Sequence, residues 1–391
     1  MTNLDSPLRS LEQGNWLKLI CGASFGHLPA VRNLTLAYAL AGADCIDVAA
    51  DEAVIAAARE ALHIAKTLAV AARARGYGSK NISPWLMVSL NDGEDPHFRK
   101  AQFDSTQCPP ECQRPCQQIC PAQAIVFNRC ADEFSGVVAP SCYGCGRCLP
   151  ICPSQIITAQ SYIAKKEAIA PLVLSTGVDA VEIHTQVGRI DQFKQLWTSV
   201  QPWVSKLKLV AISCPDGEGL IDYLSSIYKL ISPLPCALIW QTDGRPMSGD
   251  IGDGTTIAAI KLAQKVLAAN LPGYVQLAGG TNSYTVPKLR AMGMLKKDKE
   301  TERQKDKETK RQGSLYLPIS PSPHPSISGI AYGSYARVLL SPILDRLEHM
   351  QMNQNHEISA IRLEEQPQLL WEAVEVAHKL VSLLKPSPTA C

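Results

Sequence analysis

The chain has 391 residues, 46% of them apolar, which is enough to bury a sizeable core and more than one small domain needs. Its 38 basic and 36 acidic side chains leave a formal net charge of +2, so no cationic field exists for a polyanion and no nucleic-acid partner is expected. No apolar run reaches the roughly 18 residues of a spanning helix, and no signal-peptide pattern opens the chain. A cytoplasmic protein that is not membrane-spanning is therefore expected.

Eight short apolar segments alternate with amphipathic stretches along the chain. Several are near-continuous apolar runs, as expected for parallel strands that are covered on both faces. The predicted strands are Trp16–Cys21, Asp44–Val48, Trp85–Leu90, Ala180–His184, Leu207–Ser213, Ala237–Gln241, Tyr274–Ala278 and Ile327–Tyr332. Helical segments are predicted between them, at Val31–Ala41, Ala53–Ala74, Asp191–Val204, Gly219–Leu230 and Thr255–Ala269.

This alternation predicts an α/β fold, a (β/α)8 TIM-like barrel, with an open doubly wound sheet as the alternative. A cysteine-rich block follows the third predicted strand and indicates an inserted α+β two-cluster ferredoxin module. The expected domains are residues 14–105 for the first part of the barrel, 106–160 for the iron–sulfur module and 161–391 for the remainder. In a barrel, this connection opens on the face that carries active sites.

A charged repeat lies between the seventh and eighth predicted strands. Lys297–Gln304 reads KDKETERQ, Lys305–Gln312 reads KDKETKRQ, and a Pro/Ser-rich stretch follows. Because such a composition buries little apolar surface, residues 296–326 are expected to be a disordered low-complexity insertion. A tolerated loop insertion is favoured over a docking segment, since charge runs are usually solvated.

The second half of the cysteine block is an unbroken C-x2-C-x2-C-x3-C-P motif. It consists of Cys142, Cys145, Cys148 and Cys152, followed by Pro153. This spacing is typical of bacterial ferredoxins, in which the fourth cysteine of the run binds the neighbouring cluster. Zinc sites with four thiolates usually pair two C-x2-C knuckles across a longer spacer, so iron–sulfur is favoured over zinc.

The first half of the block is less regular. Three residues separate each successive pair of its cysteines, which are Cys108, Cys112, Cys116 and Cys120. Its ending, CQQICPAQAI, nevertheless parallels CLPICPSQII in the second half. This duplication predicts a two-cluster ferredoxin, in which each cluster takes three cysteines from one motif and the last from the other. The widened gap from Cys108 to Cys116 also resembles seven-iron ferredoxins, where three thiolates hold a three-iron cluster.

Each predicted cluster therefore draws ligands from both motifs. The regular site is assigned Cys142, Cys145, Cys148 and Cys120. The irregular site is assigned Cys108, Cys116 and Cys152. Cys112 could be a fourth ligand there, a spare thiol that lets the cluster gain or lose an iron, or a bystander. One four-iron cluster, and one cluster of the four-iron or three-iron type, are expected.

Glycines follow the last two predicted strands, at Gly279, Gly280 and Gly333, with Ser334 directly after the last. At these positions of a barrel, backbone N–H groups can approach a phosphate, as in flavin-binding barrels. Flavin is not expected here, since glycine is also common in such turns. The same face would carry three polar residues as ligand contacts or ordinary surface groups: His27, His184 and Arg189. No catalytic acid, base or nucleophile is evident.

Several segments together resemble the cyanobacterial light-dependent period family, LdpA. They are GNWLKLICGASF from Gly14, GADCIDVAAD from Gly42, the irregular cysteine quartet, and LAGGTN ending at Asn282. The similarity covers nearly all of the chain except the charged repeat. It implies an iron–sulfur protein that conveys cellular redox state, and hence light conditions, to the circadian clock.

Three functions remain open. The first is a redox sensor, whose partners would be circadian-clock or other signalling proteins and an electron donor of the photosynthetic or cytoplasmic pool. The second is a flavin- and iron–sulfur-dependent oxidoreductase of the barrel type. The third is a plain electron carrier, which would not need so large a barrel. The sensor is favoured, while enzymatic activity depends on whether the barrel mouth holds a second cofactor or a substrate.

Overall fold

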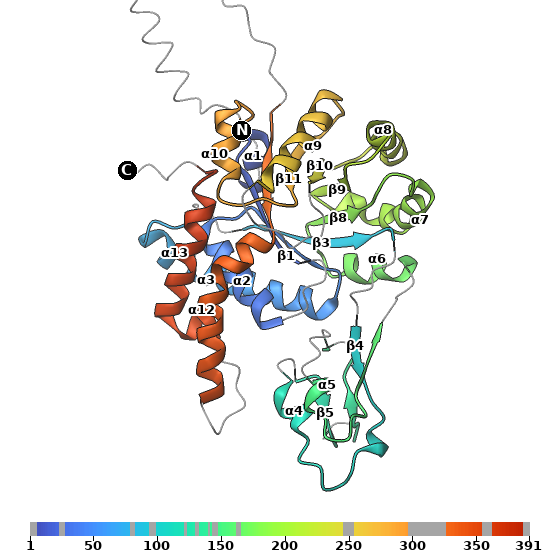
Figure 1. The fold of residues 1–391 in the computed structure, drawn as a ribbon, viewed down its shortest axis with the longest axis vertical. Coiled ribbons are helices and arrows are strands. Elements are labelled where there is room, and N and C mark those ends of the chain that lie inside the picture. The colour runs from blue at the N-terminus through green and yellow to red at the C-terminus, as the bar shows by residue number, and fades with distance from the viewer. Residues whose placement is uncertain are drawn as a thin grey trace, which may run out of the picture.

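Eight parallel strands close into a barrel in the computed structural model (Figure 1). Around the barrel they run β1 (Trp16–Gly22), β12 (Gly329–Tyr332), β11 (Tyr274–Ala278), β10 (Ala237–Asp243), β9 (Leu209–Pro215), β8 (Ala180–His184), β3 (Trp85–Asn91) and β2 (Cys45–Ala49). The structure describes residues 6–22, 28–78, 83–93, 99–120, 123–129, 133–139, 141–142, 148–161, 166–244, 254–295, 326–353 and 362–385. The predicted barrel is confirmed, and the open sheet is excluded.

Each predicted strand overlaps an observed one, with shifts of a few residues at some ends. Strand β9 begins at Leu209 because the chain up to Lys206 is still in the 3-10 helix η2 (Gln201–Lys206). At the eighth strand, Ile327 forms only an isolated bridge with Leu295, and β12 begins at Gly329.

Helices cover the outside of the barrel. They are α2 (Leu28–Ala41), α3 (Glu52–Ala74), α6 (Lys166–Ser175), α7 (Ile190–Val200), α8 (Leu220–Ile231), α9 (Thr256–Ala268), α10 (Thr285–Ala291), α12 (Ser334–Asn353) and α13 (Pro367–Val381), and α1 (Ser6–Gln13) precedes β1. The helix predicted over Asp191–Val204 ends early, since η2 starts at Gln201 with a proline in its first turn. Gly219 lies outside α8 as its N-cap, with a φ of 70°.

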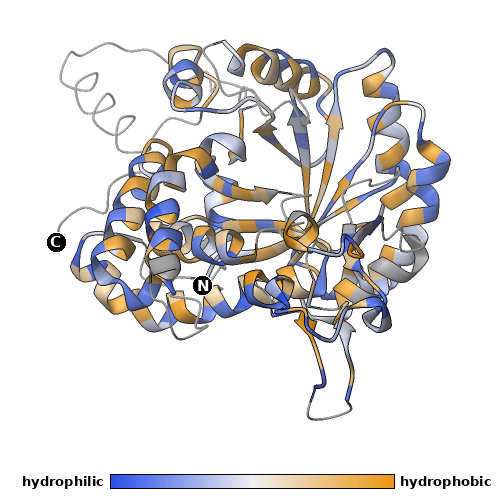
Figure 2. Ribbon diagram, turned by 60° about the horizontal axis from the view of Figure 1, so that its bottom comes forward, coloured by the Kyte–Doolittle hydropathy of each residue, from blue (hydrophilic) through white to orange (hydrophobic). Residues whose placement is uncertain are grey.

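The main hydrophobic core lies between the strands and these helices. Figure 2 shows hydrophobic residues concentrated along the strands and along one side of several helices. Cys21 and Cys214 are buried in this core, Cys236 is partly buried against it, and Cys45 is buried inside the barrel. Burial raises the pKa of the Cys21 thiol to about 12, so these cysteines are packed as small apolar side chains.

The cysteine block forms a module between β3 and α6, which projects from the barrel in Figure 1. Its elements are β4 (Arg99–Gln102), η1 (Ser105–Gln107), α4 (Pro115–Ile119), β5 (Ile125–Val126), β6 (Gly136–Val137), α5 (Cys148–Ile151) and β7 (Thr158–Ser161). Strands β4 and β7 pair antiparallel, as do β5 and β6. The module is therefore inserted after the third barrel strand, as predicted.

Two further predictions concern the chain outside these elements. The low-complexity insertion at 296–326 lies outside the described residues, apart from Ser326. Among the helices that the structure describes, none combines the length and the apolar character that a membrane span requires.

Candidate metal centre

The two halves of the module repeat the same backbone turn after their last cysteine. The Cys120 carbonyl accepts a hydrogen bond from the Gln123 N–H at 3.0 Å, and the Cys152 carbonyl accepts one from the Gln155 N–H at 3.1 Å. Both glutamines have left-handed backbone conformations, with φ of 50° and 53°. The duplication read from the sequence is therefore also a duplication of local structure.

Cysteines make up half of the buried core of the module. Its eight buried residues in the described ranges are Ala101, Cys116, Ala124, Ile125, Cys142, Cys148, Cys152 and Ile157. A core this small supplies little apolar burial for an independent module. Metal binding at the cysteines would therefore supply part of the folding free energy of the module.

Four thiols from the two halves gather at one place. The thiol of Cys108 lies beside that of Cys112 and near that of Cys152, and burial, followed by these neighbours, raises its pKa. Burial, and then the neighbouring thiols of Cys152, Cys108 and Cys112, raise the pKa of the Cys116 thiol. Thiols crowded in this way lose their protons readily when bound cations compensate the charge, which is what metal ligation provides.

Backbone N–H groups point at several of the cysteine sulfurs. Arg114 N–H donates to Cys112 Sγ at 3.4 Å, Ala124 N–H donates to Cys120 Sγ at 3.2 Å, and Ala101 N–H donates to Cys142 Sγ at 3.4 Å. Hydrogen bonds of this kind stabilise thiolates and are among the factors that set the potential of an iron–sulfur cluster. The loops thus direct N–H groups toward sulfur atoms that a cluster would use as ligands.

The remaining predicted ligands are placed less completely. Cys120 packs against the same core as Cys142 and Cys148, whereas Cys145 lies outside the described residues. In the described ranges, no three His, Cys, Asp or Glu side chains converge closely enough to hold a single metal ion. A cluster inserts its own iron and sulfide atoms between the thiolates, so its ligands stand farther apart than those of one ion.

The side chain of Lys100 forms a contact between the module and the barrel. Lys100 on β4 donates to the Ala139 carbonyl at 2.7 Å, and its Nζ lies 3.5 Å from Oδ2 of Asp51. Asp51 is the N-cap of α3, where Oδ1 accepts from the Ala53 N–H at 2.9 Å. Since the residue after Lys100 is the N–H donor to Cys142, the path from this sulfur to the barrel is short.

The glycine turns predicted to bind a phosphate lie on neighbouring strands, after β11 and β12. Gly280 has a φ of 88°, and a Cβ there would lie 2.9 Å from the carbonyl oxygen of Thr255. The Gly280 carbonyl itself accepts from Thr255 Oγ1 at 2.7 Å. Close packing against the start of α9 is thus sufficient reason for this glycine.

After β12, Gly333 leads directly into α12, whose first residue is Ser334. Ser334 Oγ accepts from Nη2 of Arg337 at 3.0 Å, and Nη1 of the same arginine donates to the Ile20 carbonyl at 3.1 Å. These contacts join the start of α12 to β1. Phosphate binding at either turn stays a prediction.

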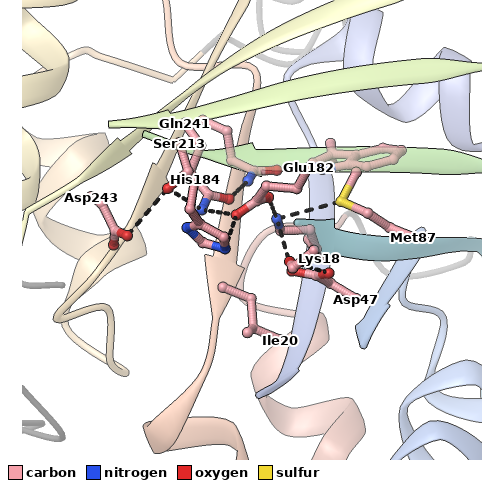
Figure 3. A network of polar contacts seen from close by, with 12 residues as sticks. Lys18, Ile20, Asp47, Met87, Glu182, His184, Ser213, Gln241 and Asp243 are labelled. Carbon is pink, nitrogen blue, oxygen red and sulfur yellow. Dashed lines mark hydrogen bonds and ion pairs between the residues drawn. The ribbon is translucent and has the colours of Figure 1, made fainter. Parts of the chain in front are cut away.

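The sequence did not reveal a polar network inside the barrel, which Figure 3 shows. Lys18 contacts Glu182 and Asp47, and His184 lies beside Glu182. His184 was singled out only as a contact at a strand end, and His27, named with it, lies outside the described residues. The sequence feature that could have revealed this network is the charged residue inside each of three apolar strands: Lys18, Asp47 and Glu182.

Comparison with known proteins agrees with this architecture. The model of the LdpA Fe-S cluster-binding domain matches residues 108–163, and that of the light dependent period A C-terminal domain matches residues 172–383. The protein "Light dependent period A" of Synechococcus elongatus is 45% identical over 379 residues, which are 97% of this chain and 94% of that protein. The chain is therefore an iron–sulfur-binding member of the LdpA family.

Proposed function

We propose that this protein holds two iron–sulfur clusters and reports cellular redox state to the circadian clock. The observation that carries the proposal is the gathering of Cys108, Cys112 and Cys116 around Cys152, which comes from the other half of the module. An exchange of the last cysteine between the motifs is the arrangement of two-cluster ferredoxins. The irregular site takes these four thiols, and the regular site takes Cys120, Cys142, Cys145 and Cys148.

The residues fit such clusters in their chemistry. The donor set is all thiol, and N–H groups point at Sγ of Cys112, Cys120 and Cys142. A bound cluster supplies one-electron chemistry, and its charge changes by one unit on reduction. The polypeptide holds the thiolates, and Lys100 links the Cys142 loop to Asp51 on the barrel. A change of charge at Cys142 can therefore alter the neighbouring barrel loop.

The clock role draws on the relative from Synechococcus elongatus, whose printed name is light dependent period A. The resemblance extends over 97% of this chain. The partners would be clock or other signalling proteins, and the input would be an electron donor of the photosynthetic or cytoplasmic pool.

The test replaces the Synechococcus elongatus protein with this chain and follows a circadian reporter at several light intensities. The unaltered chain should restore the dependence of period on light. Cys116→Ser should not restore it, and the purified variant should have lost iron and sulfide. Cys236→Ser, which alters a half-buried cysteine of the barrel, is the matched control and should behave like the unaltered chain.

Two results would contradict the proposal. One is anaerobically purified protein whose absorption spectrum, iron content and sulfide content exclude two clusters. The other is a Cys116→Ser variant that is deficient in iron but restores the light-dependent period in full. Flavin is counted in the same preparation, because stoichiometric flavin would favour the oxidoreductase alternative.

A further inference from the structure

The interior of the barrel changes character along its axis. The half near the amino ends of the strands is apolar and contains Leu11, Trp16, Cys45, Trp85, Met87, Ala180, Leu209, Ala211 and Ile239. Toward the carboxyl ends, the buried residues include charged and amide side chains (Figure 3). Barrel interiors are mostly filled by branched apolar residues. The polar half therefore needs an explanation other than packing.

Lys18 of β1 is the centre of this polar half. Its Nζ forms an ion pair with Oε2 of Glu182 on β8, lies 3.4 Å from Oδ2 of Asp47 on β2, and lies 3.7 Å from Sδ of Met87. Ser89 on β3 donates to the other oxygen of Asp47 at 2.8 Å. Burial raises the pKa of Asp47 to about 6, whereas the closer ammonium of Lys18 keeps the pKa of Glu182 below its usual value despite burial.

Glu182 connects this ion pair to the mouth of the barrel. Its Oε1 accepts from Nε2 of Gln241 at 2.6 Å and lies 3.2 Å from Nε2 of His184. Gln241 in turn accepts from Gln276 at 2.6 Å. With both of its oxygens engaged, Glu182 is fixed in place, and its carboxylate lies beside the imidazole of His184.

Stability alone does not account for such a network. The side chains of Lys18 and Glu182 are fully buried, and Asp47 is only 1% exposed. Withdrawing an ion from water costs about several kcal/mol, and apolar residues of similar volume are often as good or better for stability. Costly buried charges with shifted pKa values in a cleft are characteristic of functional sites.

The network reaches solvent near the carboxyl ends of the strands. The His184 side chain, at the last residue of β8, is 27% exposed. Asp243, the last residue of β10, is half-buried and accepts from Ser213 Oγ at 3.2 Å. Figure 3 shows His184, Ser213 and Asp243 at the same end of the barrel. This is the carboxyl end of the strands, where barrel active sites lie.

We propose that this mouth is an acid–base site for a small, uncharged hydroxy-carbonyl compound, with His184 as the residue that exchanges a proton with the substrate. Glu182 and Lys18 are positioning residues that hold the imidazole. This acid–base activity would be separate from the proposed redox-sensing function and does not depend on it.

The charges of the site argue for an uncharged substrate. The carboxylates of Asp47 and Glu182 flank one ammonium, that of Lys18, and the carboxyl group of Asp243, whose pKa is raised by burial, lies near His184. An anionic substrate would be repelled by this excess, and the effect is stronger in a buried site than in water. Hydroxyl and carbonyl oxygens can instead hydrogen-bond to His184 and Asp243 without adding a charge.

The reaction is proton exchange at the carbon beside the carbonyl group. The C–H bond breaks, an N–H bond forms on the His184 imidazole, and the electron pair moves onto the carbonyl oxygen, which takes a proton from the carboxyl group of Asp243, so that a neutral enol forms. The reverse step returns a proton to carbon. No oxidant or reductant takes part, so the reaction can be measured independently of the redox state of the module.

The experiment incubates the whole protein with hydroxyacetone in D2O and follows the loss of the C–H signals by proton NMR. Exchange should be saturable, faster than in buffer alone, and slower with pyruvate, which is anionic. His184→Gln should lower the rate by about a hundredfold or more, the usual contribution of a general base. His63→Gln, which changes an exposed histidine of α3, is the control and should leave the rate unchanged.

A second measurement covers the case in which His184→Gln fails to fold. Diethyl pyrocarbonate is added to the unaltered protein, and carbethoxylation of His184 is located by mass spectrometry. Exchange activity should disappear in step with modification of this residue. The proposal is overturned if exchange never exceeds the buffer rate, if pyruvate exchanges faster than hydroxyacetone, or if activity persists when His184 is replaced or modified.

Discussion

The role of Cys112 decides which type of cluster we expect in the irregular half of the module. Its spacing allows a fourth ligand, a spare thiol or a bystander, and the sequence does not separate these alternatives. In the structure its thiol contacts that of Cys108 and receives the N–H of Arg114 at 3.4 Å. A bystander cysteine needs neither contact, so a ligand role is favoured.

Replacing Cys112 by serine should convert a four-iron site into a three-iron site. The iron content should fall from about eight to about seven atoms per chain, and an EPR signal should appear in the oxidised protein, because three thiolates remain. Cys236→Ser is the control and should change neither measurement. Unchanged iron content and spectra in Cys112→Ser would mean that this cysteine is not a ligand.

Single residues also mark the limit of what the sequence can predict. The cysteine motifs were evident because their ligands are close in the chain, with short, characteristic spacings. Lys18, Asp47 and Glu182 are far apart in the chain and meet only because the barrel closes. One charged residue in an apolar strand gives no information on its partner until the register of the strands is known.

Elements of secondary structure were predicted well where they are apolar and continuous. The strands of the barrel are such runs, since helices cover one face and the barrel interior the other. Strands β4, RKAQ, and β7, TAQS, show no such pattern and were missed. They pair across more than fifty residues, from Arg99 to Ser161, and only the folding of the intervening cysteine loops brings them together.

Strand β4 provides the clearest test of coupling between the module and the barrel. Lys100 places a positive charge one residue from the N–H donor to Cys142, and it contacts Asp51 at the start of α3. A nearby cation stabilises the more negative, reduced state of a cluster. Lys100→Met should therefore lower the midpoint potential of the regular cluster.

A partly exposed charge pair contributes about 0.2–1 kcal/mol. For a one-electron couple, a free-energy change of about 1.4 kcal/mol corresponds to about 59 mV, so the midpoint potential should shift by about 10–40 mV. A potentiometric titration monitored by EPR measures it. Lys66→Met, on the exposed side of α3, is the control and should leave the potential unchanged. A Lys100→Met protein with full iron content and the same potential would rule out this electrostatic role.

In the whole molecule, the iron–sulfur module and a polar barrel mouth share one face. The module leaves the barrel after β3, whose last residue is Asn91, and Lys100 contacts the loop after β2. These are carboxyl ends of strands, as are the positions of His184 and Asp243. Fold class and module insertion followed from the sequence because they depend on the order of elements. Their contacts depend on packing between distant segments, which the order does not specify.

The charged repeat is inserted between β11 and β12. The residues that flank it are held together, since Leu295 and Ile327 form a parallel bridge and the Ile327 N–H donates to the Met294 carbonyl at 2.9 Å. The long insertion therefore begins and ends at one place on the barrel. Shortening it changes only the length of a closed loop, and the entropy of closure depends weakly on length.

Deletion of residues 297–312 should therefore leave the melting temperature within about 2 °C and the iron content unchanged, since a change in loop length of this size is worth less than about 1 kcal/mol. Differential scanning calorimetry and iron analysis of the whole protein provide the measurements. A variant in which a Gly/Ser sequence of equal length replaces the repeat separates the effect of length from that of charge. If both variants lose several degrees of stability, the repeat packs against the barrel; if only the deletion does, the bridge between Leu295 and Ile327 requires the longer loop.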